Sequence, residues 1–240
     1  MYYTYIGEVL LMNGYYEKIK FVKTKIVSYL NEIFKVYGNE LLLRLEEYNL
    51  LQNKYNCIES STAIGFIMEE FIVSKLETYS QSHNNIDDIR IERIVSRGTQ
   101  TTSYDCYVNY QDVFFMINVK VDKGNNNAVS AINILHNDYV CKNPEQEKSF
   151  LVLKTNYTFG ESKVTKERKI LIQSISIYAL EEVDFSIGHK QDHRNWSEEF
   201  NPASGRLQVS KKFRELNTLQ EEEISYNKTK QFIQKMYYAQ

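Results

Sequence analysis

The first part of the chain repeats apolar residues at helical spacing. Between residues 15 and 37 the apolar positions recur every three or four residues, at Ile19, Val22, Ile26, Leu30, Ile33 and Phe34. This spacing predicts a helix that ends near Gly38. The stretches "ELLLRLEEYNLLQ" (40–52) and "IGFIMEEFIVSKLETYS" (64–80) predict two more helices, the latter capped by Ser60, Ser61 or Thr62. The chain is therefore expected to begin with three helices.

After His83 the pattern changes to β-branched and aromatic residues that alternate with polar ones. Five strands are predicted, from the segments "IRIERIV", "YDCYVNY", "VFFMINVKV", "SFLVLKTNY" and "RKILIQSISIYAL". Between the third and fourth lies "NNNAVSAINILHNDYV", whose apolar spacing suits a helix. This order predicts an α/β fold with a mixed sheet, in which a crossover helix joins the central strands.

The composition is that of a globular protein. Charged residues make up 25% and apolar residues 42% of the 240 positions, which excludes a disordered or membrane class. The apolar run Ile6 to Met12 is too short for a secretory signal, so a cytoplasmic protein without a membrane segment is expected. The formal charge of −2 argues against nonspecific coating of polyanions, although positive charge can still gather in one cleft. With no linker or repeat, residues 1–240 are interpreted as one domain.

The segment "SYDCYVNYQDVFFMINVKVD" contains a candidate metal site. Asp105 opens a strand, the pair "QD" suits a turn, and Asn118 and Lys120 share one face of the returning strand. A carboxylate can hold Mg²⁺, and a lysine beside it can position the attacking water or a phosphate. A hairpin with one acid and one lysine is more often a surface pair, so further residues have to support the hypothesis.

The helix predicted over 64–80 supplies such a residue. On a helical wheel, Glu69 falls inside the apolar arc between Leu76 and Val73, whereas Glu70 and Glu77 fall outside it. A carboxylate on a buried face needs a cation or a metal ion as compensation. Glu69 could therefore supply the charge that Asn118 lacks, or it could lie at the helix edge and reach water. Asp122, two residues beyond Lys120, is a second possible donor.

These residues together resemble the PD-(D/E)XK nuclease superfamily, and type II restriction endonucleases in particular. The resemblance covers about residues 60 to 155 and implies a restriction-endonuclease-like core. In that family a strand-opening acid is followed by an acid, any residue and a lysine on the next strand, and an earlier helix often adds a glutamate. Asp105, Lys120 and Glu69 match, whereas Asn118 departs from the second acid. An amide oxygen can ligate a hard cation but brings no charge, so Asn118 is expected as an auxiliary ligand.

The resemblance implies a Mg²⁺-dependent enzyme that cuts double-stranded DNA at a short, palindromic sequence as a homodimer. Residues 1–59 would form a helical N-terminal part, 60–180 the catalytic core and 181–240 a mixed part that reads DNA. The long helix from Tyr15 could provide a dimer face or pack internally. Candidate DNA contacts are a polar helix start, a basic loop and a Gly-containing loop: Asn125, Asn126, Asn127 and Ser130; Lys163 and Lys166; Arg206 and Gln208.

Two alternatives remain open from the sequence. The chain could be a catalytically silent DNA-binding module of the same fold, or a nuclease that resolves junctions or repairs DNA. Gly98 and Gly124 form neither a GxGxxG motif nor a Walker loop, so no nucleotide cofactor is expected.

Overall fold

The fold was analysed in a computed structural model of the chain. It describes residues 14–36, 38, 40–41, 61–82, 88–94, 102–123, 127–161, 168–192, 205–210, 213 and 219–239. The helices are α1 (Tyr15–Val36), α2 (Ser61–Ser82), α3 (Ile132–His136) and α5 (Tyr226–Tyr238). A π-helical turn follows α3 (Asn137–Cys141), and short 3-10 turns cover Leu180–Glu182, Phe185–Ile187 and Glu221–Glu223.

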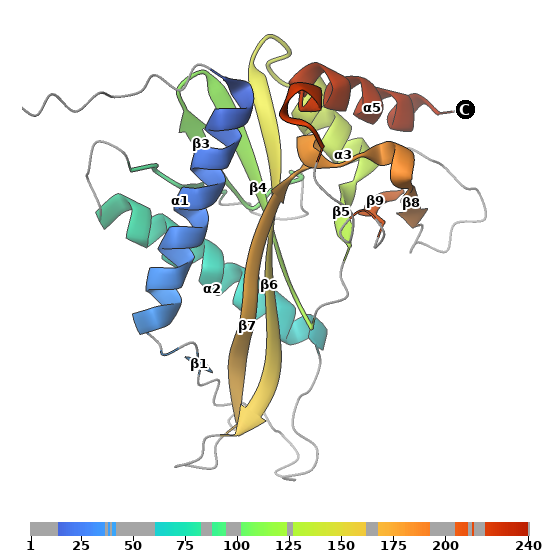
Figure 1. Ribbon diagram of the computed structural model, residues 1–240. Coiled ribbons are helices and arrows are strands. Elements are labelled where there is room, and N and C mark those ends of the chain that lie inside the picture. Colours follow the sequence, from blue (N-terminus) through green and yellow to red (C-terminus); the bar gives the residue numbers. More distant parts are fainter. Residues whose placement is uncertain are drawn as a thin grey trace, which may run out of the picture.

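The strands form two sheets (Figure 1). The large mixed sheet has the order β1-β7-β6-β4-β3-β2, and the small sheet the order β5-β9-β8. The large sheet contains β1 (Glu40–Leu41), β2 (Glu92–Arg93), β3 (Cys106–Tyr110), β4 (Val113–Asp122), β6 (Glu147–Glu161) and β7 (Arg168–Ala179). The small sheet contains β5 (Ala128–Ala131), β8 (His189–Asp192) and β9 (Arg206–Val209). The central strands β4 and β6 are parallel, which requires the crossover through β5 and α3.

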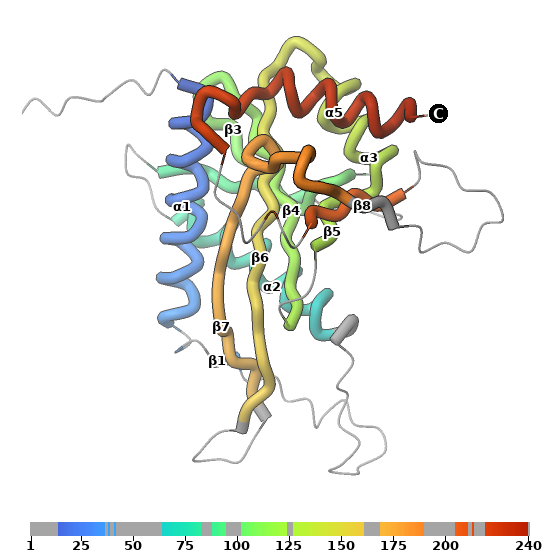
Figure 2. Tube along the Cα trace, turned by 45° about the vertical axis from the view of Figure 1, so that its right-hand side comes forward, coloured from blue at the N-terminus to red at the C-terminus, as the bar shows by residue number. Residues whose placement is uncertain are grey.

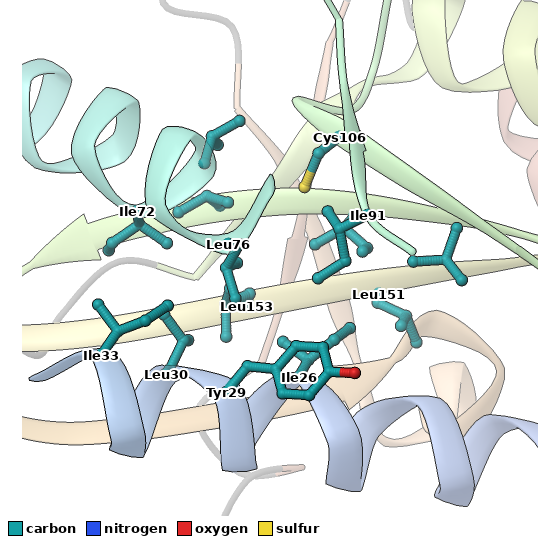
Figure 3. Packing of buried hydrophobic residues seen from close by; sticks show 14 of the residues in the cluster. Ile26, Tyr29, Leu30, Ile33, Ile72, Leu76, Ile91, Cys106, Leu151 and Leu153 are labelled. Atoms are coloured by element: carbon teal, nitrogen blue, oxygen red, sulfur yellow. The ribbon is translucent and has the colours of Figure 1, made fainter. Parts of the chain in front are cut away.

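The helices α1 and α2 cover one face of the large sheet. Alternate residues of β4, such as Phe115, Ile117 and Val119, point to this face and are fully buried. Figure 3 shows how Leu30 of α1, Leu76 of α2 and Leu151 and Leu153 of β6 meet there, among the residues Ile26, Tyr29, Ile33, Ile72, Ile91 and Cys106. The apolar stripe of α1 is thus part of the core and is not a dimer face.

The opposite face of the sheet is covered by α3, α5 and the small sheet (Figure 1). Met116 of β4 and Val152 of β6 pack there against Val129 of β5 and Leu207 of β9, and all four are almost completely buried. Burial on both faces explains why β4 and β6 read as nearly continuous apolar runs. Asn118 and Lys120 follow Met116 on this same face.

The hairpin of β6 and β7 extends beyond the rest of the sheet. Asn156 of β6 pairs with Asp122, the last residue of β4, whereas β6 continues to Glu161 and stays paired with β7 up to Arg168. Figure 2 shows this pair of strands as a long arm past the end of β4. The five residues beyond Asn156 correspond to roughly 17 Å of strand.

The α/β class with a mixed sheet flanked by helices is confirmed, as are the helices around residues 15–36 and 61–82. The helix expected over 40–52 is wrong at its start, because Glu40 and Leu41 pair with β7, and residues 42–52 lie outside the described residues. The helix expected over 125–140 begins only at Ile132, because residues 128–131 pair with β9 as a strand. Among the described helices, none combines the length and apolar composition that crossing a bilayer requires.

Candidate active site

The site is built on a stretch of β4 that has no neighbouring strand on one side among the described residues. The partner strand β3 begins at Cys106, which pairs with Ile117, and the backbone of Asp105 adds one more hydrogen bond to Ile117 O at 2.9 Å. Beyond this point, no described strand pairs with β4 on the β3 side. We call the backbone groups of Val119 and Val121 on that side the open edge of β4.

Three side chains from three elements occupy the open edge. The carboxylate of Asp105 accepts a hydrogen bond from Val119 N at 2.7 Å, and the Lys120 ammonium donates to Val119 O at 3.0 Å. The backbone of Val121 donates to the carboxylate of Glu69. Residues two apart on a strand are separated by roughly 6.6 Å, so both carboxylates lie on one short segment of β4. The charge of Lys120 acts on each of them.

Helix α2 packs closely on this segment at Gly65, where a methyl group would still fit but a longer side chain would meet β4. A Cβ atom added at Gly65 would lie 3.6 Å from Val121 O, so a larger side chain would push the helix away. Glu69 follows one helical turn later and is half-buried. The position of Glu69 inside the apolar arc thus reflects its contact with β4.

Burial and neighbouring charges act against each other on the two acids. Burial raises the pKa of Glu69, the Lys120 ammonium and the Val121 backbone lower it, and the Asp105 carboxylate raises it. Burial also raises the pKa of Asp105, while the Lys120 ammonium and the Val119 N–H lower it. Each acid therefore experiences the charge of Lys120, and Glu69 experiences that of Asp105. Such an arrangement of perturbed acids around a lysine is typical of functional sites.

Asn118 and Asp122 lie apart from this arrangement. Asn118 is 2% exposed, and its Nδ2 donates to Ser103 O at 2.6 Å and to Val129 O at 3.3 Å. Its Oδ1 has no hydrogen-bond partner among the described residues. The charge of Asp122 acts on Tyr157, whose pKa is raised by burial and by this carboxylate. The structure therefore brings Glu69 to the open edge.

Three of the described candidate DNA contacts lie on strands. Arg206 and Gln208 lie on β9, and not in a loop as the sequence suggested. Because Leu207 and Val209 of the same strand are buried, Arg206 and Gln208 share its outward face. Ser130 lies on β5 rather than in the first turn of a helix. Asn127 precedes β5, and the remaining candidates, Asn125, Asn126, Lys163 and Lys166, lie outside the described residues.

Sequence reasoning missed two charged residues beside the site. Glu70 raises the pKa of Asp105, and it accepts a hydrogen bond of 2.7 Å from Arg93 Nη2. Arg93 lies at the end of β2, opposite Cys106. The helical wheel places Glu70 outside the apolar arc, and its side chain is exposed. Its charge nevertheless acts on Asp105, so the exposed side of α2 borders the site.

The residues at the open edge suit a hard divalent cation. Mg²⁺ is usually held by one or two carboxylates together with water and substrate phosphates. Asp105 and Glu69 provide two such carboxylates. Within the described part of the chain, no group of three or more His, Cys, Asp and Glu residues could hold a metal by itself. A metal ion at this edge would therefore depend on substrate oxygens for part of its coordination.

The chain was compared with models of known protein families and with curated proteins, and neither comparison gives a match.

Proposed function

We propose that the chain is a Mg²⁺-dependent endonuclease that hydrolyses phosphodiester bonds of double-stranded DNA at a short specific sequence. It would work in the manner of type II restriction endonucleases of the PD-(D/E)XK superfamily. The single observation that carries this proposal is the meeting of Asp105, Glu69 and Lys120 at the open edge of β4. Two acids and one lysine, from a helix, a strand start and the next strand, are the residues that the family resemblance selects.

Each residue has a role that follows from its chemistry. Asp105 and Glu69 would hold Mg²⁺, which when bound neutralises charge on the phosphate. The charge of the Lys120 ammonium acts on both acids, and from this place it can orient the attacking water or hold a phosphate oxygen.

The test is cleavage of mixed plasmid DNA by the full chain in Mg²⁺. Lys120→Ala should lower the cleavage rate by about 100-fold or more, because the water and phosphate lose their cation. Binding of the same DNA in Ca²⁺ should remain. Lys35→Ala, which removes an exposed lysine at the end of α1, is the matched control and should cut normally. Equal rates for both variants would remove Lys120 from the mechanism.

The two acids give a second arm of the same experiment. Glu69→Gln and Asp105→Asn each remove one charge from the metal site and should lower cleavage by orders of magnitude. Burial raises the pKa of both acids, so the cleavage rate of the native chain should fall as the pH is lowered through their titration. Wild-type cutting by Glu69→Gln would show that the helix does not contribute to the site.

Discrete DNA fragments would indicate a restriction enzyme, and preference for branched DNA would indicate a junction-resolving or repair nuclease. Binding without cutting would indicate a silent DNA-binding module. A palindromic target would require a homodimer in which each subunit cuts one strand, which sedimentation analysis can establish.

We infer that Arg206 and Gln208 contact bases, because β9 presents both on its outward face and these side chains suit guanine and adenine edges.

A further inference from the structure

The peptide of Ser103, two residues before Asp105, is held from both sides by buried side chains. Its N–H donates to Asp138 Oδ2 at 2.6 Å, and its carbonyl accepts from Asn118 Nδ2 at 2.6 Å. Ser103 is 1% exposed, and Asn118 and Asp138 are each 2% exposed. One backbone unit is thus fixed between the central strand β4 and the π-helical turn.

The surroundings of Asn118 require a hydrogen-bond donor. Its Nδ2 faces two carbonyl oxygens, those of Ser103 and Val129, and carbonyl oxygens only accept. The amide orientation follows from this, since the reverse orientation would bring three acceptor oxygens together. A carboxylate in the same place would be buried against two acceptors without a donor, which is strongly unfavourable.

Asp138 completes the arrangement from the other side. Its Oδ1 accepts from Lys142 Nζ at 2.6 Å, so the buried carboxylate has both a backbone donor and a cation. This pairing compensates its burial and fixes its direction toward Ser103. The π-helical turn that contains Asp138 follows directly on α3.

The held peptide leads directly into the site. From Ser103 the chain passes Tyr104 and reaches Asp105, whose N–H bonds to Ile117 O and whose carboxylate bonds to Val119 N. A shift of Ser103 would therefore displace the Asp105 carboxylate relative to Lys120 and Glu69.

We propose that Asn118 is a positioning residue which, together with Asp138, holds the Ser103 peptide so that Asp105 reaches the open edge of β4. This inference rests on the proposed function in that Asp105 is the residue it serves. It gives a reason for the departure from the family pattern: position 118 requires the two donor hydrogens of an amide, which an ionised carboxylate cannot provide. The acid missing at this position is then supplied by Glu69 from α2.

The decisive variant is Asn118→Asp, which restores the acid of the family pattern. If Asn118 positions Asp105, this change should lower Mg²⁺-dependent cleavage by about 100-fold, the effect of a misplacement of about 1 Å in an active site. If position 118 is instead a metal ligand that lacks its charge, the change should preserve or increase cleavage, and the inference falls. Asn109→Asp, the same change at an exposed position of β3, is the matched control and should cut normally.

A second variant covers the case in which Asn118→Asp does not fold. Asn118→Ala removes the donor without adding a charge, and circular dichroism can confirm that its fold is kept. The readout is the titration of the Asp105 carboxyl carbon by NMR in metal-free protein, which does not require any cleavage. We expect this titration to shift toward that of a solvated aspartate in Asn118→Ala and to stay unchanged in Asn109→Ala.

The two readouts separate failure of the inference from failure of the proposed function. An unchanged Asp105 titration in folded Asn118→Ala would overturn the positioning role, whether or not the native chain cuts DNA. A native chain that does not cut, but whose Asp105 titration shifts in Asn118→Ala, would overturn the nuclease proposal and leave the positioning of Asp105 supported.

Discussion

A buried carboxylate far from the candidate site should dominate the pH dependence of stability. Glu181 follows β7 in the 3-10 turn Leu180–Glu182 and is 3% exposed. Its carboxylate accepts hydrogen bonds from Tyr139 Oη, from Ser149 Oγ at 2.9 Å and from Phe150 N at 3.2 Å. These donors lower its pKa, but burial outweighs them and raises the pKa to about 7.

The size and sign of the effect follow from this shift. The pKa rises from the ordinary 4.5 to about 7, and each unit corresponds to about 1.4 kcal/mol, so the full effect is about 3 kcal/mol. Because the folded state holds the proton more tightly, the free energy of unfolding is highest below pH 4.5. It decreases as the pH rises from 4.5 to 7 and is constant above that. Between pH 5 and pH 8 the expected loss is about 2–3 kcal/mol.

Urea denaturation at pH 5 and pH 8 measures this loss. Glu181→Gln keeps the size of the side chain and does not titrate. Its free energy of unfolding should therefore lose about 2–3 kcal/mol less than that of the native chain over this range. Glu222→Gln, at an exposed position, removes the same charge and should follow the native chain. If Glu181→Gln and the native chain show the same pH dependence, the burial argument for Glu181 is refuted.

Three further predictions concern stability and helix docking. Phe34→Ala should lower the free energy of unfolding by about 3–5 kcal/mol, because Phe34 is fully buried. The control Phe66→Ala, at a side chain that is 69% exposed, should change it by less than about 0.5 kcal/mol in the same urea titration. Gly65→Leu should displace α2 from β4 and reduce cleavage more than Gly65→Ala, which a cleavage assay checks. Lys23→Ala should cost about 3 kcal/mol in thermal or urea unfolding, since it leaves the buried Glu182 carboxylate without the ammonium 2.6 Å away; an effect below about 1 kcal/mol would contradict this.

The local sequence pattern predicted an element correctly where the spacing of its own apolar residues, or its own turn, determines its structure. Helix α1 was predicted because one stripe of its residues is buried, and the β3–β4 hairpin because Gln111 and Asp112 form a tight turn between alternating strands. The segment 128–131 was wrongly expected as a helix. Its strand conformation depends on pairing with β9, more than 70 residues later in the chain, which no local pattern reveals.

The site was predictable only in part, for a similar reason. Asp105 and Lys120 could be selected from strand spacing, and Glu69 from its place on a helical wheel. That Glu69 meets the other two depends on the docking of α2 against β4. The role of Asn118 depends on two backbone carbonyl groups, from Ser103 and Val129, whose positions only the folded chain defines. Such contacts with backbone atoms leave no signature in residue types.

The open edge of β4 also offers a spectroscopic reporter. Most amide hydrogens of β4 are bonded to neighbouring strands and exchange with solvent only when the sheet opens. Those of Val119 and Val121 are held by the carboxylates of Asp105 and Glu69 instead. Their deuterium uptake should therefore follow small rotations of two side chains, on a faster timescale than the rest of the strand. A change in the exchange rate of these two amides, with the other amides of β4 unchanged, would report ionisation or occupancy of the site. This measurement requires no turnover of substrate.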